Sequence, residues 1–168
     1  MGELLELFND YRAPAQHLTS VLLAAAIWRW GGAPERWLIG IFLVTMVVPL
    51  YVARGLGLDA YALGPYTSMI AICDLVATPL FVGIALNANR NYPLWIAGFQ
   101  LVAVVAHLVK AVVGGISPLA LAILVIGPSY CQLVLLIGGF ARHARRERRF
   151  GPYREWRTGA RPVRAWVS

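Results

Sequence analysis

Four polar residues inside long apolar stretches are the strongest candidates for chemistry in this chain. Asp74 lies in one stretch, and the next contains Gln100, His107 and Lys110. A charge at the centre of a bilayer costs about 2.5 to 3.5 kcal/mol on insertion scales, so such residues usually pair with one another or serve a function. At about 100° per residue, the last three share one face of a helix. We call these four residues the intramembrane polar cluster.

The cluster allows two interpretations. If the two helices run antiparallel, His107 lies near the depth of Asp74, and Lys110 lies about one turn closer to the membrane surface. An imidazole that titrates near neutral pH beside a carboxylate can act as a proton relay or as a counter-ion for a substrate. The alternative is a polar clamp between helices, worth about 0.6 to 2 kcal/mol. We favour the clamp, because nothing else in the chain strongly marks a transport path.

A proline near the middle of the last apolar stretch is the second candidate feature. Pro128 has no N–H to donate to the carbonyl of Leu124, which predicts a helix break or kink. Ser129 and Gln132 follow it and can satisfy freed backbone groups. Broken helices line binding cavities in transporters. Because prolines in spanning helices more often only bend them, we favour a bend here.

Two histidines raise a third possibility. His17 and His107 both lie towards the outer face on the topology given below, and two imidazoles at similar depth can ligate a b-type haem. A haem-binding redox subunit therefore remains an alternative, although we expect no cofactor and no metal. The motifs of hydrolases, zinc proteases and phosphate-binding loops are missing from the sequence. We therefore expect that the protein is not an enzyme.

Five apolar stretches supply the helices that must position these residues. With a mean hydropathy of +0.64, 59% hydrophobic residues and 14% charged residues, the chain is too apolar for an ordinary soluble domain. A spanning helix needs about 20 apolar residues. The stretches run from about Pro14 to Trp30, Arg36 to Val52, Tyr66 to Leu86, Pro93 to Val113 and Pro118 to Phe140. We predict an all-α, polytopic membrane bundle of about five transmembrane helices.

The connections and the charges divide this bundle into regions. Three of the four connections are short, which predicts antiparallel neighbours and an up-down topology; the connection from Gly55 to Pro65 is longer. Residues 1–12 have the pattern of an amphipathic interfacial helix. Residues 13–140 form the five-helix bundle, and residues 141–168 form a basic cytoplasmic tail.

Basic residues set the expected orientation. The positive-inside rule counts Lys and Arg in short loops near the spans. One side holds Arg29, Arg36, Arg90 and the tail, and the other holds Arg12, Arg54 and Lys110. We therefore expect the C-terminus in the cytoplasm and the N-terminus outside.

The start of the tail is the third candidate site. Five arginines follow the last apolar stretch: Arg142, Arg145, Arg146, Arg148 and Arg149. A basic run directly behind a span attracts anionic headgroups and fixes orientation. The formal charge of +7 is therefore better explained by a membrane than by nucleic acid. We expect this segment to bind anionic lipids or a partner subunit, and we expect no nucleic-acid partner.

One segment carries a resemblance. Residues 88–101, ANRNYPLWIAGFQL, with His107 and Leu108 following, resemble small inner-membrane proteins of alphaproteobacteria whose activity is uncharacterised. The resemblance covers one loop and one span and implies a multi-pass protein of a bacterial inner membrane. Small size, tight loops and the lack of a catalytic motif favour an accessory or assembly subunit of a larger membrane complex. A small transporter or proton-coupled permease that uses the intramembrane polar cluster is the alternative.

Overall fold

The structure, a computed structural model, describes residues 2–57, 65–113, 118–151 and 154–157. This part of the chain is helical and contains no strand. The long helices are α1 (Gly2–Trp30), α4 (Pro65–Asn87), α5 (Tyr92–Val112) and α6 (Pro118–Phe150). Between α1 and α4, α2 (Ala33–Phe42), the π-helical segment η1 (Leu43–Val47) and α3 (Val48–Gly55) follow one another without a gap. Most of the predicted long connection (58–64) and the end of the predicted tail (158–168) lie outside the described residues.

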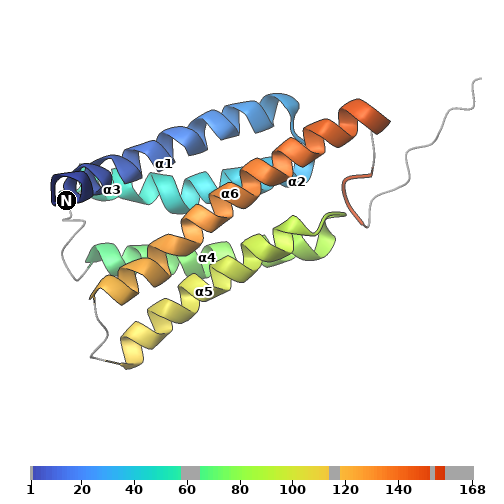
Figure 1. The fold of residues 1–168 in the computed structure, drawn as a ribbon. Coiled ribbons are helices and arrows are strands. Elements are labelled where there is room, and N and C mark those ends of the chain that lie inside the picture. The colour runs from blue at the N-terminus through green and yellow to red at the C-terminus, as the bar shows by residue number, and fades with distance from the viewer. Residues whose placement is uncertain (1, 58–64, 114–117, 152–153, 158–168) are drawn as a thin grey trace, which may run out of the picture.

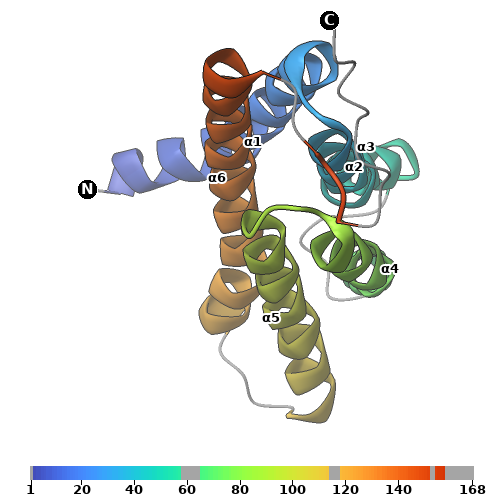
Figure 2. The same ribbon diagram turned by 90° about the vertical axis from the view of Figure 1, so that its right-hand side faces the viewer.

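The helices form one bundle in which α1, the continuous segment α2–η1–α3, α4, α5 and α6 alternate in direction (Figure 1). The helices α4, α5 and α6 pack successively side by side, and α2 contacts α1, α4 and α6. Figure 2 shows α1 crossing α6, with its N-terminal part pointing away from the other helices. The alternating directions follow from the short turns, which leave no chain length for a return crossing.

Three helices are long and apolar enough to cross a membrane. Judged by length and composition in the described part of the chain, they are Ala33–Gly55, Ser68–Asn87 and Tyr92–Val112. Large apolar side chains such as Leu101, Val105 and Leu108 point out of the bundle on α5. Hydrocarbon tails are a good solvent for such a surface, and a helix satisfies its own backbone hydrogen bonds in lipid. The chain therefore has the character of a membrane protein.

Prolines loosen these helices without ending them. The helix α1 runs through Pro14, so the predicted interfacial segment and the first apolar stretch form one continuous helix. Pro49 cannot donate to the carbonyl of Thr45, and the wider turn of η1 lies directly before it. The hydroxyl of Thr45 donates to the carbonyl of Ile41 at 2.8 Å. The helix α6 also continues through Pro128, so the chain does not break there.

The best-packed part of the core lies in the half of the bundle next to the α1–α2 turn. All five long segments of the bundle contribute fully buried side chains to it. These are Ile27 of α1, Leu38 and Phe42 of α2, Phe81 of α4, Ile96 of α5 and Leu136 of α6. Small residues such as Ala77, Ala85 and Ala97 lie between them. Large and small side chains that alternate in this way let helices approach closely.

Candidate functional site

The intramembrane polar cluster forms where α4, α5 and α6 meet. The amide of Gln100 donates to Asp74 Oδ1 at 2.9 Å and to the Asp74 carbonyl at 3.2 Å. His107 Nε2 lies 3.0 Å from Asp74 Oδ2. Both carboxylate oxygens of Asp74 therefore have a partner on α5. The helical spacing on α5 that the sequence showed brings these two residues to one carboxylate.

The third helix joins this cluster through Gln132. Its Nε2 donates to Gln100 Oε1 at 2.9 Å and to the carbonyl of Ile96 at 3.2 Å. Gln132 therefore links α6 to α5. Its neighbour Ser129 donates to the carbonyl of Ile126 at 2.7 Å and accepts from Gln16 of α1 at 3.0 Å. Both residues, which were predicted to lie at a helix break and to satisfy backbone groups, donate to backbone carbonyls and also connect helices.

Burial limits what this cluster can do. Asp74 is 2% exposed, Gln100 is 0% exposed and Gln132 is 1% exposed. Hydrogen bonds in such a low-dielectric setting strengthen one another, and breaking one leaves a costly unpaired group. The cluster is a chain of hydrogen bonds across three helices, with a carboxylate–imidazole pair at one end. That pair can share a proton, and the remaining contacts hold the helices in register.

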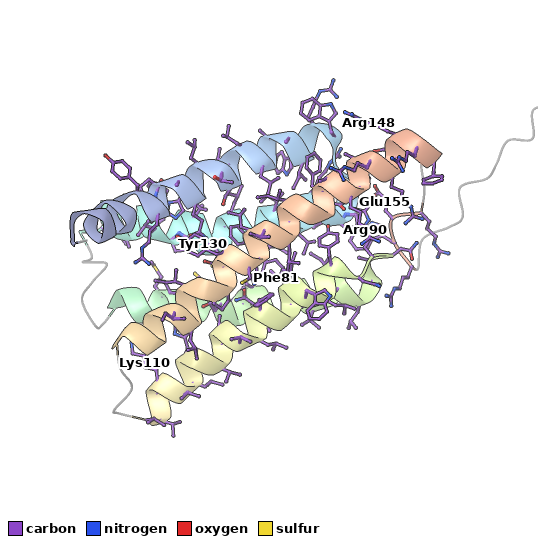
Figure 3. All side chains as sticks on the ribbon, viewed as in Figure 1. Phe81, Arg90, Lys110, Tyr130, Arg148 and Glu155 are labelled. Carbon is purple, nitrogen blue, oxygen red and sulfur yellow. The ribbon has the colours of Figure 1, made fainter. Side chains whose placement is uncertain are left out.

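Two of the residues predicted for chemistry lie apart from this network. Lys110 makes no hydrogen bond or ion pair with Asp74 or His107, and Figure 3 shows it at the opposite end of the bundle from Arg90. His17 packs against the ring of Tyr51, with 5.6 Å between ring centroids. The two imidazoles of the haem hypothesis thus have different partners. No group of three potential metal ligands occurs among the described residues.

A second set of polar residues, which the sequence did not predict, lies at the end of the bundle near the α1–α2 turn. We call Glu35, Arg90, Tyr92, His143 and Glu147 the end cluster. Glu35 and Arg90 form an ion pair, and the Tyr92 hydroxyl donates to Glu35 Oε1 at 3.0 Å. Glu35 is 0% exposed. A fully buried charge requires such partners, since its desolvation is not otherwise compensated.

His143 extends the end cluster to α6. The guanidinium of Arg90 donates to His143 Nδ1 at 3.1 Å, so the neutral imidazole carries its proton on Nε2, which lies 3.4 Å from Glu147 Oε2. Burial first, and then the charge of Arg90, lower the pKa of His143, while Glu147 and Glu155 act in the opposite direction. The imidazole is therefore held neutral between a cation and a carboxylate.

Tyr92 reaches Glu35 because a glycine faces it on α6. A Cβ atom at Gly139 would lie 2.7 Å from the Tyr92 ring, closer than real contacts allow. Tyr92 is the first residue of α5, and Glu35 lies in the first turn of α2. The missing side chain at Gly139 thus allows the start of α5 to join α2 and α6.

Four tail residues fold back over this end of the bundle. In this C-terminal strap (residues 154–157), the carbonyl of Glu155 accepts from the Asn89 N–H at 3.0 Å, and the Arg157 N–H donates to the Asn87 carbonyl at 2.8 Å. The carboxylate of Glu155 accepts from the Ala33 N–H at 3.0 Å. An acidic group at this position satisfies a free N–H and the positive end of the α2 dipole. The strap therefore connects α2, the α4–α5 loop and α6.

The arginines predicted at the start of the tail lie on two sides of one helix. Along the extension of α6, Arg142, Arg145, Arg146 and Arg149 recur at helical spacing and line one hollow together with Phe150. We call these five residues the basic stripe. Arg148 instead lines a separate pocket beside the α1–α2 turn. The predicted set is thus divided between two surfaces.

Sequence reasoning missed the end cluster for an identifiable reason. Arg90 was counted only for orientation, and Glu35 was read as part of a short connection. One signal was present: Glu35 is a single acidic residue between a Gly-Gly turn and an apolar helix. A carboxylate at the start of a span requires a partner, and Arg90 is the basic residue of the next short connection on the same side.

No protein-family model, curated protein or solved structure matches this chain. The arrangement of its side chains is therefore the ground on which a function can be argued.

Proposed function

We propose that this chain is a five-span protein of the bacterial inner membrane and a non-enzymatic accessory or assembly subunit of a larger membrane complex. The observation that carries the proposal is that the buried polar groups bond to one another between helices. Asp74, Gln100 and Gln132 are each 2% exposed or less and bind α4, α5 and α6 together. Groups used in this way give a bundle one fixed packing, which suits a subunit with a structural task.

Aromatic residues at both ends support a membrane setting for all five helices. At one end, Trp28, Trp37 and Trp95 are 65%, 63% and 66% exposed, and at the other Tyr11 and Tyr51 are 65% and 53% exposed. Tryptophan and tyrosine favour the headgroup layers on both faces of a bilayer. In this arrangement α1 and α6 cross together with the three more apolar helices.

The distribution of arginine supports the orientation. The tryptophan-rich end holds Arg29, Arg36, Arg90 and the α6 extension, and the other end holds Arg12, Arg54 and Lys110. By the positive-inside rule the first end faces the cytoplasm. The C-terminus then lies in the cytoplasm and the N-terminus outside.

The basic stripe supplies the contact for an acidic partner subunit. Its arginines share one helix face, and Phe150 beside them is 79% exposed. Complementary charges speed the association of two proteins and fix their relative orientation, and an exposed aromatic side chain can insert into a pocket of the partner. A neighbouring subunit with acidic residues at the cytoplasmic membrane surface fits these features.

Native electrophoresis of the tagged protein from its own membranes in a mild detergent tests the proposal. We expect the protein to migrate in one large complex whose other subunits are stoichiometric by mass spectrometry. Substituting Arg142, Arg145 and Arg149 by Gln should release it from that complex. The matched control removes three charges at the opposite end, at Arg12, Arg54 and Lys110, and should leave the complex intact. A wild-type protein that migrates alone would contradict the accessory role.

A small proton-coupled transporter is the second candidate, and the 3.0 Å contact between His107 and Asp74 favours it. Asp74→Asn keeps a hydrogen-bond acceptor for Gln100 but removes the ionisable group. Proteoliposomes that contain a pH-sensitive dye report proton flux after a pH jump. A flux that Asp74→Asn abolishes, with the amount of folded protein unchanged, supports transport. A flux no greater than that of protein-free liposomes removes this candidate.

A further inference from the structure

A pocket of about 450 Å³ lies beside the α1–α2 turn and is lined by arginines from three separate parts of the chain. Arg29 belongs to the last turn of α1, Arg36 to α2 and Arg148 to the α6 extension. We call it the arginine pocket. The volume falls within the range of roughly 300 to 1,000 Å³ that is common for ligand sites. Figure 3 shows Arg148 at the same end of the bundle as Arg90 and Glu155.

None of the three guanidinium groups forms an ion pair with a carboxylate within the described residues. Arg29 lies over the ring of Trp30, with its Cζ 5.6 Å from the ring centroid. The three arginines outnumber the two carboxylates of the pocket lining, Glu147 and Glu155, so the pocket has a net positive charge. Such a site attracts an anion.

The carboxylates that line the pocket already have partners. Glu147 faces His143 Nε2 at 3.4 Å, and Glu155 accepts from the Ala33 N–H at 3.0 Å. Glu155 itself lies directly against Gly32, where a Cβ atom would collide with its carboxylate. These two groups are committed to α6 and to the start of α2. They leave the arginines available to a ligand from outside.

Exposed tryptophans at this end of the bundle indicate the depth of the pocket relative to a bilayer. Trp30 lines the pocket, and Trp28, Trp30 and Trp37 are 65%, 61% and 63% exposed. Exposed tryptophans of this kind lie at the level of lipid headgroups. Guanidinium groups bind phosphate oxygens through paired, charge-assisted hydrogen bonds. The chemistry and the depth of the pocket therefore agree.

We propose that the arginine pocket binds the phosphate group of an anionic ligand, either a phospholipid headgroup or a soluble phosphate ester. Arg29, Arg36 and Arg148 contact the phosphate oxygens. The ligand thereby ties the α1–α2 turn to the α6 extension. The lipid source rests on the proposed membrane insertion, while the site itself does not.

Two binding measurements on the purified full-length protein test the site and distinguish a phospholipid headgroup from a soluble phosphate ester as the ligand. Native mass spectrometry counts phosphatidylglycerol retained in detergent, with phosphatidylcholine as the zwitterionic comparison. Calorimetry measures binding of inorganic phosphate to the protein in phosphatidylcholine nanodiscs. Retention of one phosphatidylglycerol without phosphate binding identifies a headgroup site. Phosphate binding without selective lipid retention identifies a soluble ligand.

Paired variants decide whether the pocket is responsible. Substituting Arg36 and Arg148 by Gln should weaken binding by roughly tenfold or more, because charge-assisted hydrogen bonds are lost. The control substitutes Arg12 and Arg54 by Gln, which removes the same charge outside the pocket, at the opposite end of the bundle. It should change binding by less than about twofold, since exposed charges act through screened, long-range attraction.

Conservative variants and a stability measurement keep the test decisive. Arg36→Lys with Arg148→Lys retains the charge but loses the paired geometry, so its binding should fall between wild type and the Gln variant. Thermal unfolding of each variant in detergent checks that the fold persists. The proposal fails if wild type binds neither probe, or if pocket and control variants weaken binding equally. A wild-type protein that migrates alone in native electrophoresis but retains the lipid would contradict the accessory role alone.

Discussion

The intramembrane polar cluster and the end cluster hold the same bundle together by different means. In the first, Asp74 is surrounded by side chains of long helices, and its partners Gln100 and His107 are neutral or titratable. In the second, a full ion pair between Glu35 and Arg90 joins a helix start to a connecting loop. The first fixes helix faces against one another. The second fixes the places where helices begin and end.

The two clusters also differ in what happens when one member is lost. A hydrogen bond between an amide and a carboxylate leaves a polar group behind, at a cost of about 1 to 3 kcal/mol. A buried ion pair leaves a full charge without compensation, which costs about 3 to 5 kcal/mol. The end cluster should therefore be the more sensitive of the two. The following predictions test this order.

The largest effect is expected for Glu35→Ala. Arg90, whose side chain is 7% exposed, then keeps a buried charge without its carboxylate, so the free energy of unfolding should fall by about 3 to 5 kcal/mol. Unfolding in mixed detergent and dodecyl sulfate micelles measures this. The double variant Glu35→Ala with Arg90→Ala should lose less than the sum of the two single losses. A loss below about 1 kcal/mol for Glu35→Ala would reverse the order of the two clusters.

A smaller loss is expected for Asp74→Ala. Gln100 and His107 lose their shared acceptor, so we expect about 1 to 3 kcal/mol by the same measurement. Asp74→Asn keeps one acceptor oxygen and should cost less than Asp74→Ala. Lys110→Ala is the control, because Lys110 contacts neither residue, and it should stay within about 0.5 kcal/mol of wild type. If Asp74→Ala and Lys110→Ala lowered the free energy of unfolding equally, the hydrogen bonds of Asp74 would not act as a clamp between the helices.

Glu155→Ala should lower the global free energy of unfolding still less, but it should make the C-terminal strap easier to cleave. The variant removes an acceptor from the Ala33 N–H, which is worth about 0.5 to 2 kcal/mol for a helix cap. Because the strap opens locally, trypsin should cleave after Arg154 and Arg157 about tenfold faster. Glu147→Ala removes the same charge nearby but leaves the cap intact. If both variants are cleaved at the same rate, the cap does not hold the strap.

The last prediction concerns pH. Because the pKa of His143 is lower in the folded protein than its ordinary value, the unfolded chain takes up the proton first as pH falls. Stability is thus full above a pH of about 6.5, the ordinary value for histidine, and declines as the pH falls below it. We expect this to be the mildest change, since Glu147 and Glu155 oppose the shift.

Thermal unfolding in detergent between pH 7.5 and 5 measures this decline. His143→Gln cannot take up the proton, so its midpoint should vary less with pH than that of wild type. His107→Gln is the matched histidine variant outside the end cluster. A wild-type midpoint that rises on acidification would show that Arg90 does not keep the imidazole neutral.

The candidate site was predictable where it follows helical geometry. The sequence brought Asp74, Gln100 and His107 together because residues on one face of a helix recur at a fixed period and a short connection forces neighbouring helices antiparallel. Lys110 lies on the same face one helical turn beyond His107, yet it makes no hydrogen bond or ion pair with Asp74 or His107, since depth along the helix as well as its face decides which residues meet. Gln132 was predicted to lie at a helix break because Pro128 is four residues before it, and its hydrogen bond to Gln100 of α5 was not predicted.

The sequence by itself determined that the secondary structure consists of long apolar helices. Length, apolar composition and short turns predict helices that can cross a membrane, and these properties depend on local chain geometry and on transfer from water to hydrocarbon. The position of each proline is also local, but whether it breaks a helix is not. The helix continues through its proline in α1, in the continuous segment α2–η1–α3 and in α6.

Only the tertiary structure decided which loop and tail residues meet. Glu35, Arg90, His143 and Glu155 come from four places in the chain with no common period, so no sequence window contains their relationship. Their partners are fixed by the requirement that every buried charge be compensated once the helices have packed. The same packing divides the tail arginines between the basic stripe and the arginine pocket. Periodicity can place a residue on a face, but only the assembled bundle determines what that face touches.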